Sequence, residues 1–376
     1  MIAAYGRVRE RMRASDPEFT RLHGATRSTL ACVLTAALCI SWLVERHMPI
    51  TLAALATLFA MIAPLFLRDR NRADWLVSLG LLYFCTCASF TLPALAASHP
   101  FVRGALLLSI VFMGMLCHAL GPRAAGCALL ALVAFYLGLY LHPSPHMLHA
   151  MLALSTLAPL VVAWVARVLP PPGGAAQARL APALASRRRS RLAHALNRCK
   201  TRLQRDLDTL ARHRHHLAWR PAVLATIAAL LALLAGDEMS SERSMWAVIS
   251  TFVVFLGTHS REGTVARVGK RLVGTLAGAA ASVLLVALFK GEPWVLVGLM
   301  ALCVFGWAYF ILHAYTRGVF FITLLVGLVY GELGFAIVAL AVLRVEEVVL
   351  GCLIAFALSV SLMPSSAARR EEALLT

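Results

Sequence analysis

Three ionisable residues, Arg344, Glu346 and Glu347, lie directly before an apolar segment of about bilayer length. Ionisable side chains beside a membrane span are costly and generally face a partner, a cavity or an interface. Arg344 can pair with a substrate carboxylate or with a glutamate, and Glu346 or Glu347 can take up a proton. The three residues therefore predict a substrate and ion pathway. The alternative is that all three lie at the level of the outer headgroups.

Four further residues are candidates for the same pathway. Trp246 can form an aromatic wall for a ring-bearing substrate, although interfacial aromatic belts also place tryptophan at helix ends. Arg271 precedes Thr275 by one helical turn at a membrane boundary, where its charge either attracts anionic substrates or anchors the helix end. His313 can titrate near neutral pH or serve as a packing residue. The sequence keeps both interpretations open for these residues.

Gly274 and Gly278 stand four residues apart and therefore share one face of a helix. Because glycine has no side chain, a neighbouring backbone can approach this face closely. We expect these two residues to serve helix packing.

No pattern in the sequence predicts catalysis or a bound cofactor. We find no phosphate-binding Gly-Lys-Ser/Thr loop, no metalloprotease helix motif and no nucleophile elbow. Two groups of histidines lack the carboxylate or cysteine support of a metal site. These groups are His142, His146 and His149, and His213, His215 and His216. We therefore expect no enzyme activity, no metal and no cofactor, and active transport would draw on an ion gradient.

The elements that must position these residues are membrane helices. Of the 376 residues, 60% are hydrophobic and only 14% are charged, which is more apolar surface than a soluble core can bury. The predicted helices span 26–44, 50–67, 75–95, 101–120, 123–141, 147–168, 220–236, 245–258, 269–289, 294–314, 318–331 and 341–363. The expected fold class is an all-α integral membrane protein with about twelve transmembrane helices.

The charged residues predict the orientation in the membrane. The net charge is +17, and the cations gather in alternate loops, whereas the intervening loops are short and poor in cations. By the positive-inside rule, we expect both termini to lie in the cytoplasm. Residues 1–25 then form a cytoplasmic segment, and residues 364–376 form a cytoplasmic tail. Because the charge follows the membrane loops, we expect no nucleic-acid partner.

A basic segment, residues 169–219, joins the two apolar stretches 26–168 and 220–363. Four leucines recur in it at heptad spacing, which predicts an amphipathic cytoplasmic helix. They are Leu196, Leu203, Leu210 and Leu217. We expect this helix to lie on anionic membrane lipids, and a self-associating coiled segment is the alternative.

The two apolar stretches are expected to be parallel repeats of six helices each. They have equal numbers of predicted helices in the same orientation, so an axis along the membrane normal can relate them. Residues 48–53 open the second helix of the first stretch, and residues 245–250 open the matching helix of the second. The predicted architecture is two six-helix pseudo-repeat bundles joined by the basic linker.

Two motifs in the second stretch resemble the fusaric acid resistance family of inner-membrane transporters. The more specific motif is the Arg-Leu-Val-Gly-Thr-Leu-Ala-Gly run over 271–278. The second runs from Arg344 to Gly351 and precedes an apolar helix that ends at Pro364. The resemblance extends over 240–364 and is faint over 26–168.

The resemblance implies export of aromatic or other hydrophobic carboxylic acids, and proton coupling is our inference. Plant malate channels are more distant relatives, so a channel-like pathway for organic anions is one alternative. A noncatalytic membrane scaffold whose linker recruits a partner is another. The expected partners are a small organic acid and membrane lipids. A homo-oligomer and a periplasmic adaptor protein are expectations at the level of the family alone.

Overall fold

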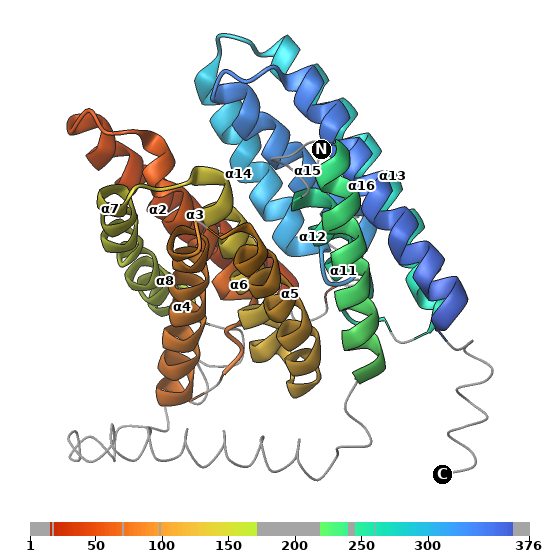
Figure 1. The fold of residues 1–376 in the computed structure, drawn as a ribbon. Coiled ribbons are helices and arrows are strands. Elements are labelled where there is room, and N and C mark those ends of the chain that lie inside the picture. The colour runs from red at the N-terminus through yellow and green to blue at the C-terminus, as the bar shows by residue number, and fades with distance from the viewer. Residues whose placement is uncertain are drawn as a thin grey trace. The chain divides into compact units, whose positions relative to one another are not determined.

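Every element of the chain that the structure describes is a helix (Figure 1). This computed structural model describes residue 16 and the ranges 19–69, 71–97, 99–170, 219–239, 245–258 and 260–363. The helices are α2 (Thr20–Glu45), η1 (Ile50–Ala53), α3 (Ala54–Phe66), α4 (Arg72–Leu95), α5 (Pro100–Cys117), η2 (His118–Leu120), α6 (Pro122–Leu141), α7 (Pro145–Ser155), α8 (Leu157–Val168), α11 (Trp219–Met239), α12 (Met245–Phe255), α13 (Arg261–Leu288), α14 (Pro293–Phe310), α15 (Tyr315–Glu332) and α16 (Ile337–Leu362). The heptad leucines of the predicted linker and the predicted tail lie outside the described residues.

Eight helices in the described part of the chain are long and apolar enough to cross a membrane. Two shorter apolar helices, over Ile50–Phe66 and Trp246–Phe255, occupy the second position in each predicted repeat. The protein is therefore an all-α, multi-pass membrane protein. The layout of twelve spans in two repeats stays a prediction.

Several helices begin earlier than the apolar pattern predicts, and α13 and α16 are among them. α13 begins at Arg261, because the Ser260 side chain accepts a hydrogen bond from the Gly263 N–H and so caps the first turn. α16 begins at Ile337 and is a continuous helix of 26 residues. Arg344, Glu346 and Glu347 therefore lie well inside this helix.

By their contacts, the helices form two compact units that do not follow the order of the chain. Unit 1 consists of residues 1–83 and 149–213, and unit 2 consists of residues 84–148 and 214–376. The units are defined by contacts and the predicted domains by sequence pattern, so the predicted domain boundaries stay a prediction.

Unit 1 is built on α2, which packs against α3 and α8. The Asp16 carboxylate accepts hydrogen bonds at 3.0 Å from two backbone N–H groups in the first turn of α2 and so caps this helix. Phe59 meets the Tyr83 ring edge-on at 5.5 Å between centroids, and the Tyr83 and Ser155 hydroxyls lie 2.9 Å apart. Apart from these polar contacts, this core is mainly aliphatic.

Unit 2 holds the residues that the sequence marks as functional. Its short helix α12 packs between α11 and α16, with Phe252 and Phe255 fully buried. α13 lies beside both α15 and α16, and α14 packs on α15 (Figure 1). The four helices α12, α13, α15 and α16 thus pack together, and side chains from all four can meet in their shared interior.

Glycines bring α13 and α15 into backbone contact. A Cβ added to Gly274 or to Gly278 would lie 2.6 Å from a carbonyl oxygen of α15. From the other helix, a Cβ on Gly327 or Gly331 would lie 2.3 or 2.6 Å from a side chain of α13. Small residues at such positions let two helices gain van der Waals contact over a long face. The α13 and α15 pair is therefore closely packed along its length.

We expect Gly278→Ala to destabilise the protein although alanine favours a helix. The added methyl group would meet the Phe320 carbonyl oxygen, and overpacking of this kind costs about 1–3 kcal/mol. Gly298→Ala is the matched control, because a Cβ at Gly298 meets nothing within 4 Å. Thermal unfolding of the two purified variants in detergent measures the difference. Equal midpoints would show that the α13 and α15 contact is looser than described.

Candidate functional site

Three charged side chains are buried inside unit 2, and they converge at the start of α12. Arg271 and Arg344 are each 7% exposed, and Glu347 is 3% exposed. They are the buried charged residues among the described positions of this unit. Since a buried charge is costly unless it is balanced, a group of two cations and one anion needs a specific explanation. We call Arg271, Arg344, Glu347 and the adjoining Trp246 the buried cluster.

The Arg344 guanidinium lies over an aromatic ring. Its central carbon is 3.9 Å from the centroid of the Trp246 ring, which is a close cation–π contact. Nε and Nη1 of Arg344 have no hydrogen-bond partner within the described ranges. A buried N–H without an acceptor costs free energy, and more so when the group is charged. Arg344 therefore presents two strong donors beside an aromatic surface, which is a suitable place for an anionic group.

Glu347 binds the N-terminal end of α12. Its Oε2 accepts a hydrogen bond of 3.2 Å from the Trp246 backbone N–H. The first N–H groups of a helix lack partners within the helix, and the helix dipole there favours a negative charge. The start of α12 therefore binds the Glu347 carboxylate, one turn along α16 from Arg344.

Gly351 lets the backbones of α12 and α16 approach each other next to this contact. A Cβ at Gly351 would lie 2.3 Å from the Ala247 carbonyl oxygen. Gly351 follows Glu347 by one helical turn, so both residues lie on the face of α16 that contacts α12. The short distance at Gly351 is what allows the Glu347 side chain to reach the first turn of α12.

A chain of hydrogen bonds connects Arg271 to the same turn of α12. The Ser250 hydroxyl donates to the Trp246 carbonyl oxygen at 2.5 Å and accepts from Nε of Arg271 at 3.1 Å. Nη1 of Arg271 donates to the Tyr315 hydroxyl at 3.4 Å. Arg267, one turn before Arg271, lies over the ring of Tyr315, with its guanidinium carbon 4.4 Å from the ring centroid. Residues of α12, α13, α15 and α16 thus form one polar network.

The structure separates the predicted pathway residues into two sets. Trp246, Arg344 and Glu347 are in contact, and Arg271 joins them through a hydroxyl group. Glu346 is exposed, because adjacent residues of a helix point in directions about 100° apart. Thr275 is buried on α13, one turn after Arg271. His313 is exposed in the turn before α15, with its ring against two aromatic residues of α14, and it does not reach the buried cluster.

Sequence reasoning missed Ser250 and Tyr315 as parts of this site. Ser250 follows Trp246 by four residues, so helical spacing alone could have placed its hydroxyl one turn further along the same face. The role of Tyr315 has no comparable signal, because it depends on how α15 packs against α13. A hydroxyl that accepts from a buried arginine is recognised only once the helices are assembled.

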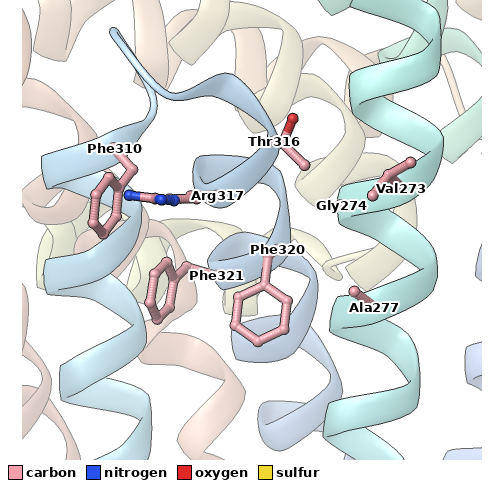
Figure 2. Close-up of a pocket in the computed structure, with 8 residues that line it drawn as sticks. All are labelled: Val273, Gly274, Ala277, Phe310, Thr316, Arg317, Phe320 and Phe321. Atoms are coloured by element: carbon pink, nitrogen blue, oxygen red, sulfur yellow. The ribbon is translucent and has the colours of Figure 1, made fainter.

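A groove of about 470 Å³ lies between α13, α14 and α15. Figure 2 shows the lining residues, with Phe310 and Phe321 close to the Arg317 side chain. They are Val273, Gly274, Ala277, Phe310, Thr316, Arg317, Phe320 and Phe321. The guanidinium carbon of Arg317 lies 5.4 Å from the centroid of the Phe310 ring. The groove therefore combines apolar and aromatic walls with one exposed cation.

One comparison with known proteins gives a match. Residues 224–358 match the family model described as fusaric acid resistance protein-like. The range includes all of the buried cluster and of the groove, so the resemblance stated for this part of the sequence is confirmed. No curated protein and no solved structure matches the chain.

We expect Ser250→Ala to lower the free energy of unfolding by about 1–3 kcal/mol, because it leaves Nε of the buried Arg271 without an acceptor. Ser109→Ala is the control, since the exposed Ser109 hydroxyl bonds only to a carbonyl oxygen one turn back in its own helix. Chemical or thermal unfolding of both variants in the same detergent gives the comparison. Identical stability would mean that Arg271 does not depend on the Ser250 hydroxyl.

Proposed function

Because residues 224–358 match the family model described as fusaric acid resistance protein-like, we propose that the protein exports aromatic or other hydrophobic carboxylic acids from a bacterial cell. In this proposal it is a proton-coupled transporter of the inner membrane, with both termini in the cytoplasm. The substrate passes through unit 2, and the buried cluster is its central binding site.

The observation that carries the proposal is the Arg344 guanidinium, buried on the Trp246 ring with two N–H donors that have no described acceptor. A carboxylate offers two oxygens in the geometry that an arginine fork binds best, and the charged hydrogen bonds are strong. An aromatic ring attached to that carboxylate can pack on the indole. A single contact region therefore suits both parts of an aromatic acid.

The short helix α12 supports the same interpretation. It has 11 residues, which corresponds to about 17 Å of helix and is less than the thickness of the hydrocarbon layer. Its N-terminal end lies next to Arg344 and Glu347 of α16. In transporters, half-length helices of this kind direct their positive ends towards anionic substrates.

We assign proton uptake to Glu347 and not to Glu346. Glu347 is buried beside Arg344, whereas Glu346 is exposed on another face of α16. Two buried arginines can balance two anionic groups, so Glu347 keeps its charge while a substrate carboxylate is bound. Exchange of substrate for protons then requires that Glu347 takes up a proton in the return step, after the substrate has left.

The groove between α13, α14 and α15 is suited to the same class of substrate. Its phenylalanine walls can bind a ring, and the exposed Arg317 can attract a carboxylate. Thr316 and Arg317 directly follow Tyr315, which contacts Arg271. A substrate in the groove would thus lie near the outermost members of the polar network.

We expect Arg344→Gln to reduce export of aromatic acids by about 30-fold or more, since the loss of one partner from a buried charged contact costs about 2–5 kcal/mol. Arg344→Lys should retain part of the activity, because it keeps the charge and loses the planar fork. Arg261→Gln, at an exposed arginine of α13, is the control with the same change of charge. The assay is accumulation of radiolabelled 4-hydroxybenzoate and fusaric acid in cells without related pumps, at equal membrane abundance of each variant.

The same assay separates the exporter from its alternatives. Addition of a protonophore should abolish the lower accumulation that the wild-type protein causes. Export that persists after the protonophore would indicate a channel-like pathway. Unchanged accumulation across a broad panel of acids, with the protein present in the membrane, would contradict the export function and favour a scaffold.

A further inference from the structure

The buried cluster carries one positive charge in excess, and we infer from this that Glu347 selects aromatic acids with a single negative charge. The inference rests on the proposed function, because it takes the cluster to be the binding site for the exported acid. It adds a specificity role for one residue, which neither the family match nor the motif supplies.

The three buried charges of the cluster are shielded from solvent. Arg271 and Arg344 contribute two positive charges, and Glu347 contributes one negative charge. A bound monocarboxylate brings the sum to zero, whereas a dicarboxylate would leave one negative charge in excess. An unbalanced charge in a buried site is strongly unfavourable, so the second carboxylate of a dianion is penalised.

The neighbouring charged groups do not change this balance. Arg267 is only half-buried, and Glu346 is exposed, so neither belongs to the enclosed group of charges. Tyr330 lies close enough to Arg344 to interact with it, but a phenol is neutral near pH 7. The Glu347 carboxylate is held in place by the Trp246 N–H at the start of α12. The excess therefore remains one positive charge in the state that accepts the substrate.

Glu347 also lies in a position from which it would repel a second carboxylate of the substrate. It precedes Gly351, which brings α16 against α12, and its oxygen occupies the first N–H group of α12. A second anion on the substrate cannot use that N–H without displacing Glu347. Glu347 thus has two roles. It balances one positive charge of the cluster, and it occupies the Trp246 N–H, which is the helix-end donor that the described contacts place beside Arg344.

The test compares two ligands of the same shape that differ by one charge. At neutral pH, 4-carbamoylbenzoate is a monoanion and terephthalate is a dianion. We expect the purified wild-type protein in lipid nanodiscs to bind the monoanion more tightly. Glu347→Gln should shift the ratio of the two dissociation constants towards terephthalate by about tenfold or more, since it removes one buried negative charge. Glu346→Gln is the matched control with the same substitution one residue away, and its ratio should equal that of the wild type.

A second variant keeps the inference testable if Glu347→Gln does not fold. Arg271→Gln removes a positive charge, so it should shift the ratio in the opposite direction, towards the monoanion. Equal ratios in the wild type and in Glu347→Gln, together with clear binding of the monoanion, would overturn the selectivity inference and leave the proposed function intact. Absence of binding for both ligands in the wild type would overturn both.

Discussion

A guanidinium buried among membrane helices loses its contacts with water, and nearby groups must replace them. In unit 2, the groups around Arg344 serve this purpose. The indole of Trp246 covers one face of the guanidinium, and Glu347 lies one turn further along the same helix. Each of these groups needs its own support. The start of α12 binds Glu347, and Ser250 ties that turn to Arg271. The position of α12 is thus determined by charge as much as by apolar packing.

Glycine and charge act together at this point of the fold. Gly351 allows α16 to approach α12 at the level of the backbone, and without that approach the Glu347 side chain would not reach the Trp246 N–H. On the opposite side, Gly274 and Gly278 bring α15 against α13, which places the Tyr315 hydroxyl within reach of Arg271. Small residues therefore set the distances on which the polar contacts depend.

The membrane helices could be predicted from the sequence because long apolar segments in lipid have few alternatives to a helix. Their starts are harder to predict, since α13 is extended by the Ser260 cap and α16 continues back through the apolar residues before Arg344. The sequence marks Arg344 as a candidate because of its cost beside an apolar run. The choice between Glu346 and Glu347 could not be made, because it depends on which face of α16 contacts α12.

The other residues of the site could not be predicted from the sequence, because their positions depend on tertiary contacts. Tyr315 and the phenylalanines around Arg317 meet their partners only where three helices pack together, and no spacing along the chain encodes that meeting. The basic linker is a different case, since its heptad pattern predicts a helix that lies outside the described residues.

The glycine contacts between α13 and α15 have a mechanical consequence. Two helices that touch along their backbones lose many van der Waals contacts at once when they separate, so α13 and α15 are held together as a pair. The turn between α12 and α13 contains Gly257, whose φ of 78° belongs to a conformation that glycine adopts readily.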